Sequence, residues 1–289
     1  NLFGGHPLGG GPMRLLIRKH DGDTVTHVQA VGPESHAEVA VGENTFRWSG
    51  HWNELHYAVD LILHQTEPAW AWRITLDAEG NNEAAGTYDA ILVQDVGLAD
   101  RGQIQNNEAY TSQYLDHQIF AHDTFGPVLA SRQNLAQHGG QHPQLLTACT
   151  AGAAGALPDA FDFFGPAARA GRAPRHADTP TISTQNRQYE FACQVIQSRP
   201  VHVADDTDRA ICFVSRCSAD HAKPSHADDL ASLAPLLSPY AFASGDGFTR
   251  FNPGHFSDPP VGWLNGIELS EAQLADRFVE ASLWRHAER

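Results

Sequence analysis

The amino-acid sequence predicts an all-β protein, a large antiparallel β-sandwich that ends in short helices. Short runs of alternating apolar and polar residues recur along most of the chain, separated by clusters of Gly, Asp, Asn and Pro. This pattern is typical of antiparallel strands joined by turns. Helical spacing of apolar residues is confined to the last part of the chain. The 289 residues exceed an average domain, but a single sandwich often reaches this length.

The N-terminal part predicts several short strands. A glycine-rich segment, Phe3–Pro12, precedes the first strand, Arg14–His20. We interpret this segment as a flexible arm, because a phosphate-binding loop would lead into a helix rather than a strand. Three more strands are expected at residues 25–31, 37–41 and 45–49, each bounded by turn residues.

The next strands are longer and more apolar. We expect a strand over His51–His64, with Tyr57, Val59, Leu61 and Leu63 on one side. A second strand sets Trp70, Trp72, Ile74 and Leu76 on one face. Since these tryptophans continue into aliphatic positions, a core role is favoured over a surface for stacking sugars. Thr87–Val96 is expected to be buried on both faces, because its apolar residues do not alternate cleanly.

The second half is less regular. Residues 151–180 are rich in Ala, Gly, Pro and Arg and predict a long irregular excursion with about one turn of helix. A loop of this length in a compact domain is usually functional or mobile. Strands are expected at residues 188–203 and 209–217, joined as a hairpin around residues 205–208. Amphipathic helices are expected at Ser225–Pro235 and Ser270–His286.

Composition excludes some classes of function. With 34 acidic and 19 basic residues the formal charge is -15, and no basic patch is available to bind nucleic acid. The 17 histidines are scattered without metal-ligand spacing, so no metal site is expected. No apolar run is long enough to cross a membrane. The four cysteines are interpreted as free thiols, which together with the lack of a signal-like N-terminus favours a cytoplasmic protein. Because the chain begins with Asn1, we expect it to be part of a longer polypeptide.

The most informative stretch is 106–143, which is unusually polar for the two strands it predicts. In an extended chain, one face would carry Glu108, Tyr110, Ser112, Tyr114 and Asp116. Carboxylates, hydroxyls and flat rings on one surface suit a sugar, whose hydroxyls accept and donate hydrogen bonds and whose C–H faces pack on aromatic rings. A solvent-facing strand with two tyrosines at its edge is the equally weighted alternative.

A loop rich in hydrogen-bond donors follows. Gly139 and Gly140 let its backbone fold sharply, and we favour a ligand-facing loop over a solvated turn. The residues expected to bind substrate are Tyr110, Gln113, Tyr114, Asp116, His117, Arg132, Gln133, Asn134, Gln137 and His138.

Glu108 and Asp116 resemble the carboxylate pair of a glycosidase, but their expected spacing argues against that role. Eight residues of strand would separate them by about 26 Å, whereas a glycosidase needs roughly 5 to 9.5 Å. Asp116 and His117 are adjacent and would point to opposite faces, so they do not form an acid–base pair either.

Four segments, Glu108–His117, Ala130–Pro143, Gln188–Ser198 and Ser218–Leu230, together resemble the N-terminal sandwich domain of glycoside hydrolase family 94 phosphorylases. Within that family the pattern is most similar to the 1,2-β-oligoglucan phosphorylases, and next to the C-terminal region of cyclic β-1,2-glucan synthases. The resemblance covers most of the chain. Each motif is moderately specific, and their order strengthens the match.

This resemblance implies a galactose-mutarotase-like super-sandwich at residues 1–268, and at residues 269–289 the start of a helical linker to an (α/α)6 catalytic domain outside the chain. The parent reaction would be reversible, inverting phosphorolysis of β-1,2-glucooligosaccharides to α-glucose 1-phosphate. Inorganic phosphate would be the co-substrate, and no other cofactor is implied. Phosphate is already an anionic nucleophile, so only a general acid is needed. In the family that acid is an aspartate of the barrel, so no catalytic residue is expected here.

The resemblance also implies that the domain supports the barrel, joins a homodimer interface and lends loops to the rim of the active site. Two alternatives stay open. The chain would otherwise be a stand-alone carbohydrate-binding module that uses Tyr110, Tyr114 and the Arg132 loop, or a mutarotase-like sugar epimerase, although no motif for the latter is found.

Overall fold

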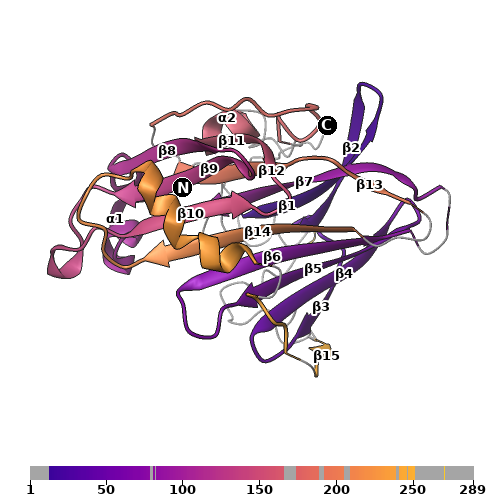
Figure 1. Cartoon of the computed structure of the whole chain (residues 1–289), viewed down its shortest axis with the longest axis horizontal. Coiled ribbons are helices and arrows are strands. Elements are labelled where there is room, and N and C mark those ends of the chain that lie inside the picture. The colour runs from indigo at the N-terminus through magenta and orange to yellow at the C-terminus, as the bar shows by residue number, and fades with distance from the viewer. Residues whose placement is uncertain are drawn as a thin grey trace. The chain divides into compact units, whose positions relative to one another are not determined.

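The computed structural model describes residues 13–78, 81, 83–165, 174–188, 192–204, 209–238, 241–245, 247–250 and 270, except for the side chains at positions 105 and 108. Within them, two antiparallel sheets pack face to face, which confirms the all-β sandwich (Figure 1). The first sheet has six strands in the order β11-β12-β7-β1-β2, with β13 also paired to β7. Their bounds are β1 Arg14–Asp21, β2 Thr24–Val31, β7 Gly86–Asp95, β11 Ala153–Asp159, β12 Ala192–Ser198 and β13 Val201–Val203.

The second sheet has nine strands in the order β15-β3-β4-β5-β6-β14-β10-β9-β8. Their bounds are β3 Glu38–Val41, β4 Thr45–Trp52, β5 Leu55–Leu63, β6 Ala69–Asp77, β8 Leu115–His122, β9 Gly126–Gln133, β10 Gln144–Cys149, β14 Arg209–Ser218 and β15 Thr249–Arg250. The helical elements are α1 Arg101–Ser112, η1 His138–Gly140, α2 Ala160–Phe164, η3 Ala227–Ser232 and η4 Ala234–Leu237.

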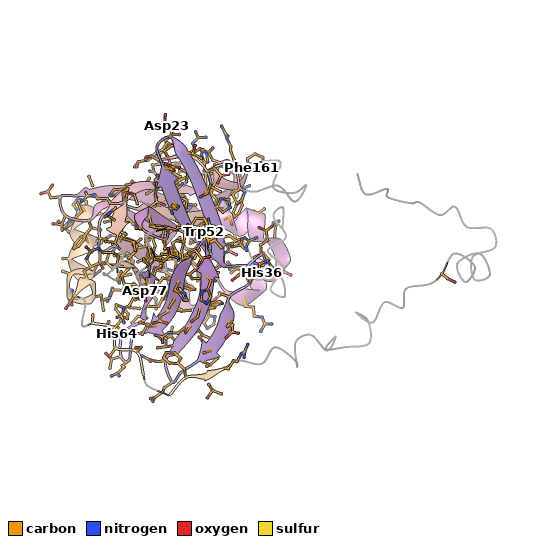
Figure 2. All side chains as sticks on the ribbon, turned by 90° about the vertical axis from the view of Figure 1, so that its right-hand side faces the viewer. Asp23, His36, Trp52, His64, Asp77 and Phe161 are labelled. Atoms are coloured by element: carbon orange, nitrogen blue, oxygen red, sulfur yellow. The ribbon has the colours of Figure 1, made fainter. Side chains whose placement is uncertain are left out.

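The main core lies between the two sheets. Ile17 of β1 and Leu92 of β7 pack with Ile74, Leu76 and the other inward residues of the large sheet. At the end of the sandwich that faces the viewer in Figure 2, Trp52 packs against this core, with its ring 6.4 Å from that of Tyr88. The tryptophans of β6 are confirmed as core residues, since Trp72 is buried and Trp70 packs against the same cluster.

Each sheet also has a covered outer face. On the small sheet, Phe163 and Phe164 of α2 and the loop residue Ile182 close a second apolar cluster. There the buried Arg18 forms a two-pronged ion pair with Asp89. It also donates hydrogen bonds to the backbone carbonyls of Ala177, Thr179 and Pro180. On the large sheet, η3 and η4 lie across β10 and β14 (Figure 1), with apolar contacts from both elements to the strands beneath.

Most predicted strands are confirmed, and β7 is buried along most of its length, as expected. The prediction of one strand over His51–His64 is wrong, because Asn53 and Glu54 adopt left-handed φ angles of 48° and 63° and form the turn of a β4–β5 hairpin. Along β5, Tyr57 and Val59 are buried on one side, as this alternation predicts, but Leu63 at the end of the strand is 48% exposed.

Three further predictions about the second half are wrong. The excursion is not irregular throughout: it contains the expected turn of helix, α2, but it also contains strand β11, which was not expected. The strands β12 and β14 lie in different sheets and do not form a hairpin. Residues 227–237 form two 3-10 helices rather than one α-helix, and Pro235, which lacks an N–H donor, lies in the first turn of the second.

All four cysteines are free, as predicted. None of the helices in the described part of the chain is long and apolar enough to cross a bilayer. The glycine-rich N-terminal segment, the turn residues 205–208, residues 271–286 of the expected last helix and the expected domain boundary at 268 lie outside the described residues.

Candidate functional site

The polar stretch 106–143 does not begin as a strand. Helix α1 extends to Ser112 and β8 starts at Leu115, so the predicted alternating face from Glu108 to Asp116 is wrong. The helix is interrupted at Asn107, whose φ and ψ are -160° and 86°. The Asn107 side chain accepts a hydrogen bond of 3.0 Å from the backbone N–H of Tyr110 and so caps the last turn. Asn residues ahead of a short polar run were the signal that could have indicated a capped helix.

This helix also removes the spacing argument against a Glu108–Asp116 pair, since a helix rises only about 1.5 Å per residue. Asp116 is engaged locally instead. Its carboxylate accepts hydrogen bonds from the side-chain amides of Gln118, at 3.0 Å, and Gln188, at 3.4 Å. Asp116 therefore helps to fix the edge strand β8.

Tyr110 and Tyr114 form an exposed aromatic pair, which we call the tyrosine rim. Tyr110 is 48% exposed and Tyr114 is 36% exposed. Their hydroxyls are 2.9 Å apart, and their ring centroids lie 5.1 Å apart at an angle of 64°. The hydrogen bond to Tyr110 raises the pKa of Tyr114. Together the two residues present aromatic surface and hydroxyl groups to solvent, and Gln113 lies exposed in the turn between them.

The loop after β9 is tied to the start of α1. Asp100 donates its backbone N–H to the side chain of Gln137 at 2.7 Å, and its carboxylate accepts from the backbone N–H of His138 at 2.9 Å. The sharp turn predicted here is confirmed, with φ angles of 74° and 77° at Gly139 and Gly140. The His138 side chain is exposed on the loop. Asp100 thus anchors this loop to the start of α1.

Three of the predicted ligand-facing residues are buried and use their donors within the protein. Arg132 donates to the carbonyls of His221, at 2.7 Å, and Ala222, at 3.3 Å, and also to the side chain of the exposed Asn134. Gln133 donates to the carbonyl of Thr111 at 3.3 Å. Gln137, besides its bond to Asp100, donates to the carbonyl of Leu135 at 2.7 Å.

His117 is fully buried between the sheets, where it starts a chain of polar side chains. Its Nδ1 lies 2.8 Å from the hydroxyl of Ser131, which also receives a hydrogen bond of 2.8 Å from Gln194. Ser131 thus links the imidazole of His117 to Gln194, and the second ring nitrogen of His117 is Nε2. That atom has no hydrogen-bond partner among the described residues. Burial lowers the pKa of His117 to about 4.

This hydrogen-bonded series of side chains continues across both sheets. Thr147 donates to Gln194 at 2.5 Å and receives a hydrogen bond of 3.2 Å from Gln94, which in turn accepts from the indole N–H of Trp70 at 2.9 Å. Ser215 contacts both Gln94 and Thr147. We call this set, listed from one end to the other as His117, Ser131, Gln194, Thr147, Ser215, Gln94 and Trp70, the interior polar chain.

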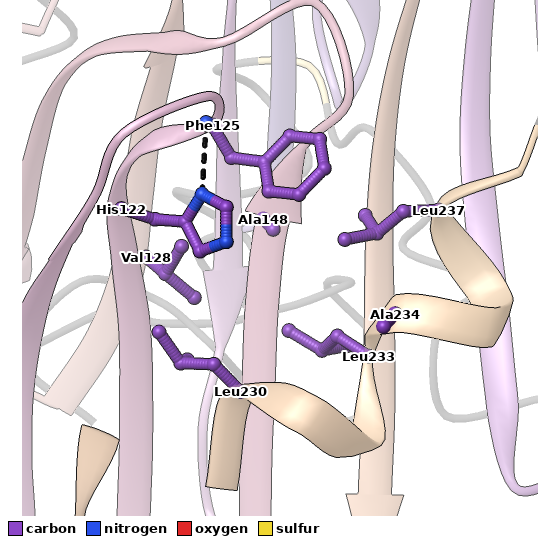
Figure 3. Close-up of a pocket in the computed structure, with 8 residues that line it drawn as sticks. All are labelled: His122, Phe125, Val128, Ala148, Leu230, Leu233, Ala234 and Leu237. Atoms are coloured by element: carbon purple, nitrogen blue, oxygen red, sulfur yellow. Dashed lines mark hydrogen bonds between the residues drawn. The ribbon is translucent and has the colours of Figure 1, made fainter. Parts of the chain in front are cut away.

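Sequence reasoning missed most of the interior polar chain. Amide side chains inside an otherwise apolar strand, as in Cys193–Gln197, were the available signal, because a buried amide needs partners. An apolar pocket lies elsewhere, between β9, β10 and the 3-10 helices, where Leu230, Leu233 and Leu237 face His122 and Phe125 (Figure 3). Its cavity volume of about 30 Å³ leaves no room for a sugar ring.

Comparison with known proteins adds a family match. Residues 1–214 match the family model described as the SOGP N-terminal domain. A 1,2-beta-oligoglucan phosphorylase of Listeria innocua serovar 6a is 27% identical over 187 residues, which cover 65% of this chain and 16% of that protein. The match therefore spans about a sixth of the length of that relative.

Likeness to solved structures is weaker. A protein from the human microbiome described as a kojibiose phosphorylase gives a TM-score of 0.41 at 9% identity, covering 77% of this chain and 24% of that one. A bacterial glucoamylase in complex with acarbose gives a TM-score of 0.42 at 7% identity, covering 78% and 28%. Likeness at this level carries no argument about function.

Proposed function

The chain belongs to the SOGP N-terminal domain family, and from this we propose that it is the non-catalytic N-terminal sandwich of a phosphorylase acting on β-1,2-glucooligosaccharides. The observation that carries the proposal is the match of residues 1–214 to an N-terminal domain, together with a relative named as a 1,2-beta-oligoglucan phosphorylase. The parent protein would cleave its substrate reversibly with inorganic phosphate and release α-glucose 1-phosphate.

The ion pairs and hydrogen bonds made by the buried carboxylates support a non-catalytic role for this domain. Asp89 is paired with Arg18, and Asp60 forms a two-pronged ion pair with Arg47. Asp159 accepts backbone N–H groups at the start of α2. A general acid must be free to give its proton to the leaving oxygen, and these groups are held in structural bonds. We therefore place the general acid in the parent's catalytic domain.

Within the parent, we propose that the tyrosine rim and the loop carrying Asn134 and His138 line the edge of the active site or meet a partner subunit. The aromatic faces and hydroxyls of Tyr110 and Tyr114 suit a glucosyl unit, since aromatic rings pack against C–H groups while hydroxyls exchange hydrogen bonds. Arg132, Gln133 and Gln137 hold this edge in place. We also propose that the parent is a homodimer and that it is located in the cytoplasm. The four free cysteines support the second point, because free thiols are typical of reducing compartments.

An assay of phosphorolysis tests the proposal. The isolated chain and the full-length parent are each incubated with sophoro-oligosaccharides and inorganic phosphate, and α-glucose 1-phosphate is measured. We expect release by the parent and none by the isolated chain. Release by the isolated chain would overturn the non-catalytic role, and a parent that is inactive on these substrates would overturn the assignment.

A second candidate, a stand-alone carbohydrate-binding module, is favoured by the exposure of the tyrosine rim. Calorimetry of the isolated chain with sophoro-oligosaccharides distinguishes it from the first. Binding that is lost in Tyr114→Ala but kept in Phe46→Ala, an aromatic residue of similar exposure at 42%, would support the module. Absence of binding heat in the wild-type chain would leave only the supporting role.

A further inference from the structure

The edge of the large sheet beside the tyrosine rim carries a block of four neighbouring residues. Asp116 of β8 lies directly opposite Arg132 of β9, so their side chains share one face of the sheet. This face is the outer one, because the adjacent His117 points into the sandwich and is fully buried. Asn134 follows Arg132 by two residues, and its backbone N–H donates to the carbonyl of Tyr114 at 2.9 Å. Helix α1 and strands β8 and β9 meet at this end of the molecule (Figure 1).

The side-chain amide of Asn134 has a defined orientation. Its Oδ1 accepts a hydrogen bond from the guanidinium of Arg132. Because a guanidinium has N–H donors and no acceptor, the amide oxygen faces Arg132, and the Nδ2 group is the donor that the exposed Asn134 can offer. Arg132 is only 5% exposed and is itself held by the carbonyls of His221 and Ala222.

The carboxylate of Asp116 is oriented in a similar way. Its Oδ1 accepts hydrogen bonds from the side-chain amides of Gln118, at 3.0 Å, and Gln188, at 3.4 Å. Its Oδ2 is an acceptor that the described part of the chain does not use, and the residue is only half-buried. An ionised carboxylate accepts hydrogen bonds and donates none. The block therefore offers an oriented donor at one corner and an oriented acceptor at another.

The block has the footprint of one sugar ring. Residues two apart along a strand are separated by about 6.6 Å, and neighbouring strands by about 4.8 Å. A sugar ring that packs its C–H face on Tyr114, which is 36% exposed, thus lies within reach of both polar groups. Two adjacent equatorial hydroxyls match these groups, since one accepts from Nδ2 of Asn134 while the other donates to Oδ2 of Asp116.

We propose that Tyr114, Asn134 and Asp116 bind one glucosyl unit through a pair of adjacent equatorial hydroxyls. We take the glucosyl ligand from the function proposed above, on which the site assignment rests. In a β-1,2-linked chain O2 carries the linkage, so the 3-OH and 4-OH form the adjacent pair of an internal unit. The site selects glucose over galactose, whose 4-OH is axial. Arg132 is a positioning residue, because it acts through Asn134.

Calorimetric titration of the 289-residue chain with sophorotriose tests the site. Asp116→Asn removes the charged acceptor, and affinity should fall at least about tenfold, since hydrogen bonds to charged groups are the stronger ones. Asn134→Asp replaces the donor by an acceptor of the same shape and keeps a partner for Arg132, and affinity should fall about 3- to 10-fold. The control Asn186→Asp changes an exposed asparagine outside the block and should match the wild type.

A second ligand separates the hydroxyl contacts from simple stacking on the tyrosine. The wild-type chain should bind the β-1,2-linked galactose trisaccharide at least about tenfold more weakly than sophorotriose, because a site built to bond a hydroxyl rejects an analogue that misplaces it. This preference should shrink in Asp116→Asn. Equal affinity of the wild-type chain for the two sugars would overturn the proposal.

Two further results are decisive. Unchanged affinity for sophorotriose in both Asp116→Asn and Asn134→Asp would also overturn the proposal. If Asp116→Asn melts earlier than the wild type, Asn134→Asp alone decides. A chain that binds no sophorotriose, although the full-length parent cleaves it with phosphate, would overturn the site and leave the phosphorolysis proposal in place.

Discussion

The interior polar chain and the tyrosine rim draw on the same polar stretch, yet the fold treats them in opposite ways. His117 and Ser131 are fully buried and joined through Gln194 to polar groups of several other strands. Tyr110 and Tyr114 lie only a few residues before His117 and are exposed, with their hydroxyls bonded to each other. Polarity in this sequence therefore marks both a buried network and a surface.

The two regions differ in how much hydration their polar groups lose on folding. A buried polar group without its partner costs about 1 to 3 kcal/mol, so the members of the interior polar chain depend on one another. Exposed hydroxyls exchange protein partners for water at little cost, which leaves the tyrosine rim free to be used in binding. We expect mutations in the first region to change stability and mutations in the second to change recognition.

The largest expected effect comes from the pH dependence of His117. The unfolded chain binds a proton at its ordinary pKa of 6.5, whereas the folded chain does so only at about 4. Between these values the unfolded state holds more protons, so the free energy of unfolding decreases as the pH falls through this window. The full contribution is about 3 kcal/mol.

Urea denaturation at pH 7 and at pH 4.5 measures this effect. The loss of stability on acidification should be smaller in His117→Asn than in the wild type. The control His138→Asn removes an exposed histidine and should retain the wild-type loss. Equal losses in all three chains would contradict a buried, neutral His117.

A smaller effect is expected from Gln194→Leu, which keeps the approximate size of the side chain but removes its amide. Ser131 and Thr147 would each lose a buried partner, and we expect a loss of about 2 kcal/mol in the free energy of unfolding. Gln118→Leu is the matched control, since the Gln118 amide bonds to the carboxylate of Asp116 in a partly exposed position. Similar losses in both variants would contradict the higher cost expected for losing a buried partner in the interior polar chain.

The smallest effect is expected at the tyrosine rim. Tyr114→Phe breaks the hydroxyl pair but should change the free energy of unfolding by no more than about 0.5 kcal/mol, because surface substitutions rarely exceed this. Tyr88→Phe removes a buried hydroxyl that donates to the carbonyl of Ala84 at 2.6 Å and should cost about 1 kcal/mol. A larger loss in Tyr114→Phe than in Tyr88→Phe would assign the rim a structural role.

Strand periodicity and turn residues were sufficient to predict most of the sandwich. The first four strands, the core tryptophans of β6 and the doubly buried β7 follow from local pattern, because one residue in two faces the core. The pairing of β12 with β7, rather than any hairpin with β14, depends on contacts between residues far apart in the chain. Periodicity carries no information about such contacts.

The candidate site was predicted less well, for a physical reason. Polar residues in an extended run were taken to face solvent or ligand, but Arg132 and Gln133 point into the structure, where backbone carbonyls receive their donors. Whether a polar side chain faces water or a buried acceptor depends on segments such as His221–Ala222 that arrive from elsewhere in the sequence. Tyr110 and Tyr114 are exposed, although they lie at the end of a helix and in the turn that follows it rather than on a strand.

The side chain of Gln188 caps the edge of the large sheet at β8. Its side-chain amide receives the backbone N–H of His117 at 3.1 Å and donates to the carbonyl of the same residue at 2.8 Å. These are the two bonds that a neighbouring strand would make to β8, which is the last strand of the nine-stranded sheet. An incoming chain would have to displace this amide before it could extend the sheet. One glutamine thus protects an open sheet edge against strand addition and the aggregation that such edges invite.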